Sequence, residues 1–275
     1  TRGLVFIVCI LLTFAIDALG ADSHKSSQPM ASPDSFRLLF IGNSHSASNG
    51  LPELVAKMIE TGLPGSSPSA TLAPGFGFLS DRLADGVTQE SLESRPWTHV
   101  ILQGQKYSAS GQIVYPTYGA EEWIRRVRAI GAQPILYPEH PREGNTEEGL
   151  RVHNLHLDIA SREPACVAPV GLVWDEAIKK YPTLNLHDND GNHSNINGAT
   201  LTSFVFYQVL TRQPASGLPF MPDIGVDADT QLKLREVAAT VTNKKKKRPP
   251  TVFNSSYQKR KFLQSKTEYH SPWCH

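Results

Sequence analysis

The sequence has 275 residues, of which 40% are hydrophobic and 19% are charged, as in soluble globular proteins. Its formal net charge is +1, which excludes a general excess of charge that would attract nucleic acid or an anionic surface. We therefore expect no specific nucleic-acid partner, and a globular region long enough to bury a substantial core.

The first 21 residues predict a signal peptide. Arg2 precedes an apolar run, LVFIVCILLTFAI at residues 4–16, and the small residues ALGA follow at 18–21. The run is shorter than the roughly 20 apolar residues that a membrane span needs. We therefore expect cleavage after residues 1–21 and export, to the periplasm or as a secreted protein. A retained membrane anchor is the alternative.

Residues 22–35 are polar and predict a linker, and residues 36–242 predict one domain. Buried strands are expected at residues 36–41, 69–73, 98–102, 133–137 and 166–170. Helices are expected at residues 51–63, 118–130, 147–161, 172–181, 199–210 and 229–241. Strands that alternate with helices predict a five-stranded parallel sheet with helices on both faces. Ligands of such sheets bind beyond the carboxyl ends of the strands.

Residues 243–275 form a basic tail. They contain nine Lys or Arg residues and a single acidic residue, Glu268. A solvated, disordered tail is the simpler interpretation. The alternative is electrostatic contact with an acidic envelope or polymer.

The segment FIGNSHS at residues 40–46 places Ser44 where a buried strand turns into a helix. Open backbone N–H groups gather at such turns, so a serine there is a candidate nucleophile. Equally, Ser44 could cap the turn and have no chemical role.

A serine hydroxyl needs a base before it can act as a nucleophile. His193 is the candidate base, and Asp190 stands three residues before it. A carboxylate at that spacing can accept the Nδ1 proton of the imidazole and leave Nε2 as the base. An Asx-rich turn is the alternative. A calcium-binding EF-hand loop is excluded, because His193 and Ala199 stand where Gly and Glu are required.

Hydrolysis also requires donors for an oxyanion. The backbone N–H groups of Ser44 and Gly75 and the side-chain amide of Gln105 are candidates, and losing one such donor costs about 3 kcal/mol. A turn glycine and an ordinary loop glutamine are the alternatives. His45 and His140 are candidates for substrate binding.

Four segments together resemble the ordered blocks of the SGNH (GDSL-like) hydrolase superfamily, in its Gly-Asn-Ser branch: residues 42–44, 74–75, 100–105 and 190–193. The resemblance implies a flavodoxin-like three-layer α/β/α fold and cleavage of esters, often acyl groups on carbohydrates or lipids. It implies Ser44 as nucleophile, His193 as base and Asp190 as its partner, with no metal or cofactor. Where the third block usually has Asn, this chain has Gln103-Gly104-Gln105; Gln105 is the expected donor and Gln103 its rival.

The expected function is therefore that of an exported serine esterase acting on a small-molecule or glycan ester. A non-catalytic carbohydrate- or envelope-binding module on the same fold is the main alternative. A nucleotide-binding domain is a third, because GFGFLS at residues 75–80 partly matches a dinucleotide loop but lacks its third glycine.

Overall fold

The computed structural model describes residues 36–246. The predicted signal peptide, the predicted linker and the part of the basic tail after residue 246 lie outside the described residues. Within residues 36–246, no helix combines the length and the apolar character needed to cross a membrane.

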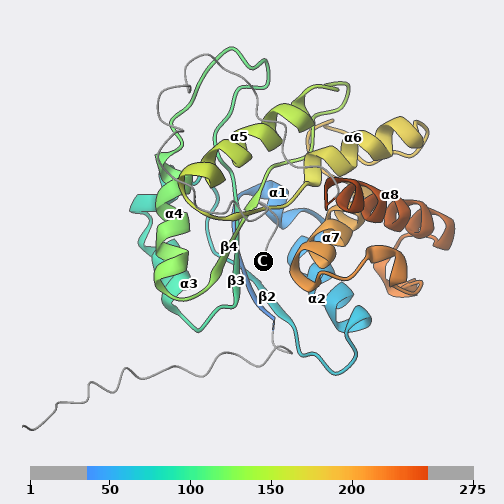
Figure 1. Ribbon diagram of the computed structural model, residues 1–275, viewed down its shortest axis with the longest axis horizontal. Helices are drawn as coiled ribbons and strands as arrows, with labels where there is room; N and C mark the ends of the chain where they lie inside the picture. The colour runs from blue at the N-terminus through green and yellow to red at the C-terminus, as the bar shows by residue number, and fades with distance from the viewer. Residues whose placement is uncertain (1–35, 247–275) are drawn as a thin grey trace, which may run out of the picture. The chain divides into compact units, whose positions relative to one another are not determined.

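A parallel sheet of five strands lies between two layers of helices (Figure 1). The strands are β1 (Arg37–Ile41), β2 (Ser69–Leu72), β3 (His99–Gln103), β4 (Gln133–Tyr137) and β5 (Cys166–Val167). Their order in the sheet is β2-β1-β3-β4-β5. The expected flavodoxin-like three-layer α/β/α fold is confirmed.

In the described part of the chain, eight α-helices connect and cover the strands: α1 (Ser44–Ala47), α2 (Leu51–Gly62), α3 (Gly86–Glu93), α4 (Tyr118–Ala129), α5 (Glu148–Arg162), α6 (Val170–Lys180), α7 (Ile196–Thr211) and α8 (Ala228–Lys246). Short 3₁₀ turns occur at η1 (Ser48–Gly50), η2 (Asp81–Ala84), η3 (Ala215–Gly217) and η4 (Pro222–Ile224).

Alternation along the strands produces two hydrophobic cores. On β1, Leu38 and Phe40 face one side, where α2, α6, α7 and α8 pack. Leu39 and Ile41 face the other side, where α3, α4 and α5 pack. Because both faces are covered, the strand is apolar at every position after Arg37, as parallel sheets require.

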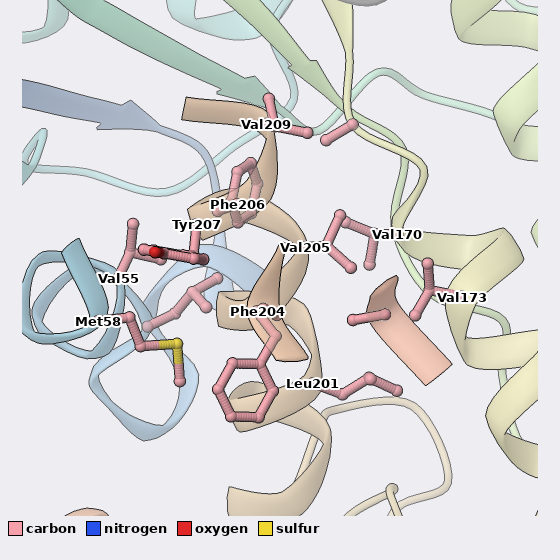
Figure 2. Packing of buried hydrophobic residues seen from close by; sticks show 14 of the residues in the cluster. Val55, Met58, Val170, Val173, Leu201, Phe204, Val205, Phe206, Tyr207 and Val209 are labelled. Atoms are coloured by element: carbon pink, nitrogen blue, oxygen red, sulfur yellow. The ribbon is translucent and has the colours of Figure 1, made fainter. Parts of the chain in front are cut away.

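Helix α7 lies at the centre of the first core (Figure 2). Its residues are buried without interruption from Gly198 to Leu210, as a helix covered on most of its faces requires. Phe204 and Phe206 pack among side chains of neighbouring elements, and Phe206 meets Phe40 of β1 edge-on at a centroid distance of 5.8 Å. The α7 backbone is thereby held firmly against the sheet, and the loop that precedes it is positioned with it.

Two expectations were incomplete. The sequence pattern did not indicate α3, which begins where the Asp85 side chain accepts a hydrogen bond from the N–H of Val87. Strand β5 was expected to continue to Val170 but ends at Val167. Pro169 has no N–H to continue the ladder, and α6 begins at the next residue.

Candidate active site

The predicted nucleophile lies at the carboxyl end of β1, in the first turn of α1. Asn43 caps this helix, and its side-chain oxygen accepts a hydrogen bond from the N–H of His45 at 3.1 Å. Ser44 is the first helical residue and is exposed. N–H groups in a first helical turn have no acceptor within the helix. The hydroxyl and the N–H of Ser44 therefore both belong to a turn that can face a substrate.

A chain of hydrogen bonds joins Ser44 to two residues from the far end of the domain. Ser44 Oγ lies 2.7 Å from His193 Nε2, and His193 Nδ1 lies 2.5 Å from Asp190 Oδ2. The other oxygen of Asp190 accepts hydrogen bonds from the N–H groups of Asn192 and His193, each at 2.9 Å. The structure thus brings the three predicted residues into hydrogen-bonding reach of one another.

The hydrogen bond from His193, followed by the two backbone N–H groups, lowers the pKa of the Asp190 carboxyl far below its ordinary value. Asp190 is therefore a carboxylate at neutral pH. An ionised partner at Nδ1 favours the tautomer in which Nε2 has no proton, which is the form that can act as a base.

The loop that carries His193 is attached to both the nucleophile segment and α7. The side chain of Asn49 donates to the carbonyl of Ser194 at 2.7 Å, a link of 145 residues along the chain. Asn195 caps α7 by accepting hydrogen bonds from the N–H groups of Asn197 and Gly198. A Cβ on Gly198 would lie 2.4 Å from the indole of Trp174, so α7 enters the core at close range. These contacts explain why residues far apart in sequence meet at this edge of the sheet.

The two histidines that we predicted to bind substrate are both buried near His193. The His45 ring stacks on the His193 ring at 4.9 Å and is 9% exposed. Burial, and next the charge of His193, lowers the pKa of His45 to about 4, so the ring is neutral at pH 7. The His140 ring is 2% exposed and stacks on Trp174 at 3.9 Å. His45 therefore packs against the His193 ring and His140 packs against His45 and Trp174, and the burial of both rings does not favour direct contact with substrate.

Neither glutamine of the third block can offer its amide to an oxyanion, because Gln105 uses both amide hydrogens within its own loop and Gln103 is fully buried. Gln105 Nε2 donates to the carbonyls of Lys106 at 2.9 Å and Pro116 at 3.1 Å, and so secures its own loop. Gln103 Nε2 donates to Glu139 Oε1. The geometry therefore does not support the predicted role of Gln105 or its rival. The N–H groups of Ser44 and Gly75 remain the predicted donors, and Gly75 has the positive φ, +80°, that suits a glycine turn.

Sequence reasoning missed Arg82, a buried residue of η2. Its Nη1 donates to the carbonyls of Gly42 and Gly75, each at 2.7 Å, and its Nη2 donates to the carbonyl of Pro74 at 2.6 Å. One guanidinium thus joins the strand end that precedes Ser44 to the turn that contains Gly75. No local pattern distinguished Arg82 from a surface arginine.

Glu139 was also missed as a functional residue. It follows β4 and is buried, with Gln103 Nε2 and the Tyr107 hydroxyl as donors to its two oxygens. Burial raises the pKa of its carboxyl to about 7. The available signal was its position, because a carboxylate directly after a buried strand lies at the edge where ligands bind.

The site occupies the point where the order of the sheet reverses. Strands β1 and β3 are neighbours, and the connections that leave them run to opposite sides, so their carboxyl ends are not crossed by a helix.

Within residues 36–246, no group of three or more His, Cys, Asp or Glu side chains could hold a metal ion.

No protein-family model matches the chain, and no curated protein sequence matches it. Among solved structures, a DUF4886 family protein from Bacteroides uniformis aligns with a TM-score of 0.64 and 13% identity, over 76% of this chain and 95% of that chain. A protein from Slackia heliotrinireducens, provisionally assigned as an SGNH hydrolase, aligns with a TM-score of 0.53 and 20% identity, over 63% of this chain and 98% of that chain.

These likenesses concern the fold. The described part of the chain has the three-layer α/β/α fold of the SGNH hydrolases, as the resemblance of the four segments implied.

Proposed function

We propose that this protein is an exported serine esterase that hydrolyses an acyl or acetyl ester of a carbohydrate or a lipid. The observation that supports the proposal most is the hydrogen-bonded series Ser44 Oγ, His193 Nε2, His193 Nδ1 and Asp190 Oδ2. A nucleophile, a base and a carboxylate that orients the base are the three parts that nucleophilic ester hydrolysis requires.

In the proposed reaction, His193 Nε2 takes the Ser44 proton as Oγ attacks the ester carbonyl. The oxygen of the tetrahedral intermediate accepts hydrogen bonds from the N–H groups of Ser44 and Gly75. The negative charge of Asp190 stabilises the imidazolium. The alcohol leaves with the proton from His193, and an acyl group remains on Ser44. Water, activated by His193, then repeats the sequence and releases the acid.

The proposal is tested with p-nitrophenyl acetate and with a fluorophosphonate that modifies active serines. We expect hydrolysis by the parent protein, a phosphonate adduct on Ser44 detected by mass spectrometry, and loss of both in Ser44→Ala. If the parent neither turns over the ester nor forms the adduct, the esterase proposal is wrong.

The same experiment distinguishes the binding-module alternative. Retention on an immobilised acetylated glycan by both the parent and Ser44→Ala, without hydrolysis by the parent, would favour that alternative. A panel of acetylated sugars and short acyl esters would then identify the preferred acyl group and alcohol.

Export is part of the proposal and depends on residues 1–21. Expression of the full chain in a host with an export pathway, followed by N-terminal sequencing of the mature protein, tests it. Mature protein that begins near residue 22 in the exported fraction is the expected result. Contact of the basic tail with an acidic polymer is tested by comparing heparin retention of the full chain and a chain ending at residue 246.

A further inference from the structure

The side chain of Gln103 lies directly behind the nucleophile turn. Gln103 is the last residue of β3 and is fully buried. Its Oε1 accepts a hydrogen bond from the backbone N–H of Asn43 at 2.7 Å and from the hydroxyl of Ser46 at 3.0 Å. These two residues stand on either side of the Ser44–His45 pair. One amide oxygen therefore holds both ends of the turn that presents the nucleophile.

This arrangement works in one orientation of the amide. The N–H of Asn43 is a donor, so the atom that faces it must be the oxygen of the Gln103 amide. The NH₂ group then faces Glu139, whose Oε1 accepts from it. Glu139 comes from the end of β4, the strand next to β3. Its second oxygen accepts from Tyr107 Oη at 3.4 Å. Glu139 Oε1 selects this orientation, because it accepts a hydrogen bond from the amide nitrogen and would oppose the amide oxygen if the amide were reversed.

The turn has no free space against the amide. A Cβ placed on Gly42 would lie 2.3 Å from Ser46 Oγ and 2.4 Å from Gln103 Oε1. Van der Waals contact requires more than 3 Å, so the backbone before Ser44 rests directly on the Gln103 side chain. A displacement of the Gln103 oxygen is therefore transmitted to Ser44.

We propose that Gln103 and Glu139 are a positioning pair for the nucleophile: Glu139 orients the Gln103 amide, and the amide oxygen sets the position of Ser44 relative to His193. The inference rests on the esterase function proposed above. It gives the third block of this chain a role other than oxyanion donor. Loss of Glu139 lets the amide rotate, and its NH₂ group then opposes the Asn43 N–H. Loss of Gln103 leaves the Asn43 N–H and the Ser46 hydroxyl without their acceptor.

A double-mutant cycle tests the pair. The variants are Glu139→Met, Gln103→Met and the double variant, since methionine has a similar length and no hydrogen-bonding amide or carboxylate. The measurements are kcat and KM for p-nitrophenyl acetate and the rate of phosphonylation of Ser44. A displacement of about 1 Å costs about 100-fold in rate, so we expect each single variant to lose about 10- to 100-fold in kcat. KM should change by less than about threefold, because binding of the ester is not altered.

Coupling is the critical result. If Glu139 acts through Gln103, the double variant should have the kcat of Gln103→Met alone. Glu139→Gln keeps an acceptor oxygen beside the Gln103 NH₂ group and should restore kcat to within about fivefold of the parent.

Gln231→Met is the matched control for loss of a buried glutamine. Gln231 is also fully buried and its side chain also makes three hydrogen bonds, to the backbone of Met221 and Val226. It should lower the melting temperature and leave kcat unchanged. If Gln103→Met and Glu139→Met behave like this control, or if their effects on kcat multiply, the pair does not position the nucleophile. If the parent itself neither hydrolyses esters nor reacts at Ser44, the proposed function is wrong and the inference is refuted with it.

Discussion

Replacement of Asp190 by asparagine tests the proposed chemistry with the smallest possible change of shape. Oδ1 of the carboxylate accepts the N–H groups of Asn192 and His193, each at 2.9 Å, and Oδ2 faces His193 Nδ1 at 2.5 Å. An amide can keep the two backbone contacts with its oxygen, so the loop should retain its conformation. Its NH₂ group then takes the place of Oδ2. The opposite orientation is disfavoured because the NH₂ group would face two backbone donors.

A donor at that position reverses the tautomer of the imidazole. His193 Nδ1 must accept from the new NH₂ group, so the proton moves to Nε2, which faces Ser44 Oγ at 2.7 Å. A protonated Nε2 cannot take the serine proton. Reversal of the tautomer in such a triad lowers kcat by about 10³- to 10⁴-fold, and we expect a loss of that size for Asp190→Asn.

The measurement is kcat for p-nitrophenyl acetate, with the concentration of reactive Ser44 determined by phosphonate titration and with the melting temperature of each variant. Asp188→Asn is the matched control, because Asp188 is an exposed residue of the same loop whose side chain accepts from the N–H of Asn189. It should retain the parent's kcat. A loss of less than about tenfold in Asp190→Asn, with the fold intact, would refute the role assigned to the carboxylate.

Three further predictions follow from buried contacts. Gly42→Ala should be destabilised by about 1–3 kcal/mol in chemical denaturation and should lose ester hydrolysis, because its Cβ would displace the Gln103 oxygen and the Ser46 hydroxyl; a fully active variant would contradict this. Arg82→Met should lose about 3 kcal/mol of stability, since the carbonyls of Gly42, Pro74 and Gly75 lose their donor; unchanged unfolding would show that water replaces the guanidinium. Burial lowers the pKa of His156 from 6.5 to about 4, so the unfolded chain binds more protons in that interval and stability should fall as the pH drops from 6.5 to 4. The shift of 2.5 (6.5 − 4) corresponds to at most about 3 kcal/mol, so the free energy of unfolding of His156→Leu should depend less steeply on pH than that of the parent; equal slopes would refute the assignment.

The sequence alone predicted the fold, and it made Ser44, His193 and Asp190 the candidates for the proposed triad, with the roles that the family resemblance implied. Apolar strands that alternate with amphipathic helices admit few arrangements, and a parallel sheet brings its carboxyl ends to one edge. The spacing of Asp190 and His193 is local, so their contact could be derived from three residues of chain. Their meeting with Ser44 followed from the chemistry that a serine requires, and the structure brings the two segments together across 149 residues.

Tertiary structure decided which polar side chains face the turn. Gln103 and Gln105 are two residues apart and chemically identical, yet the first supports Asn43 and Ser46 while the second secures the loop at Lys106 and Pro116. Between them, Gly104 has a φ of +97° and redirects the chain at the end of β3. The direction of a side chain after such a residue depends on what packs around it.

The same reason accounts for Arg82, Glu139 and His140. Each is a polar residue whose burial no local pattern predicted, and each is buried because partners distant in sequence surround it: the carbonyls of Gly42 and Gly75 for Arg82, the amide of Gln103 for Glu139, and the carbonyl of Asn192 for His140. Burial of a polar group is favourable only when such partners satisfy it, and those partners exist only in the folded chain. Residue types and spacing therefore determined the candidate chemistry, and packing alone decided which groups hold it in position.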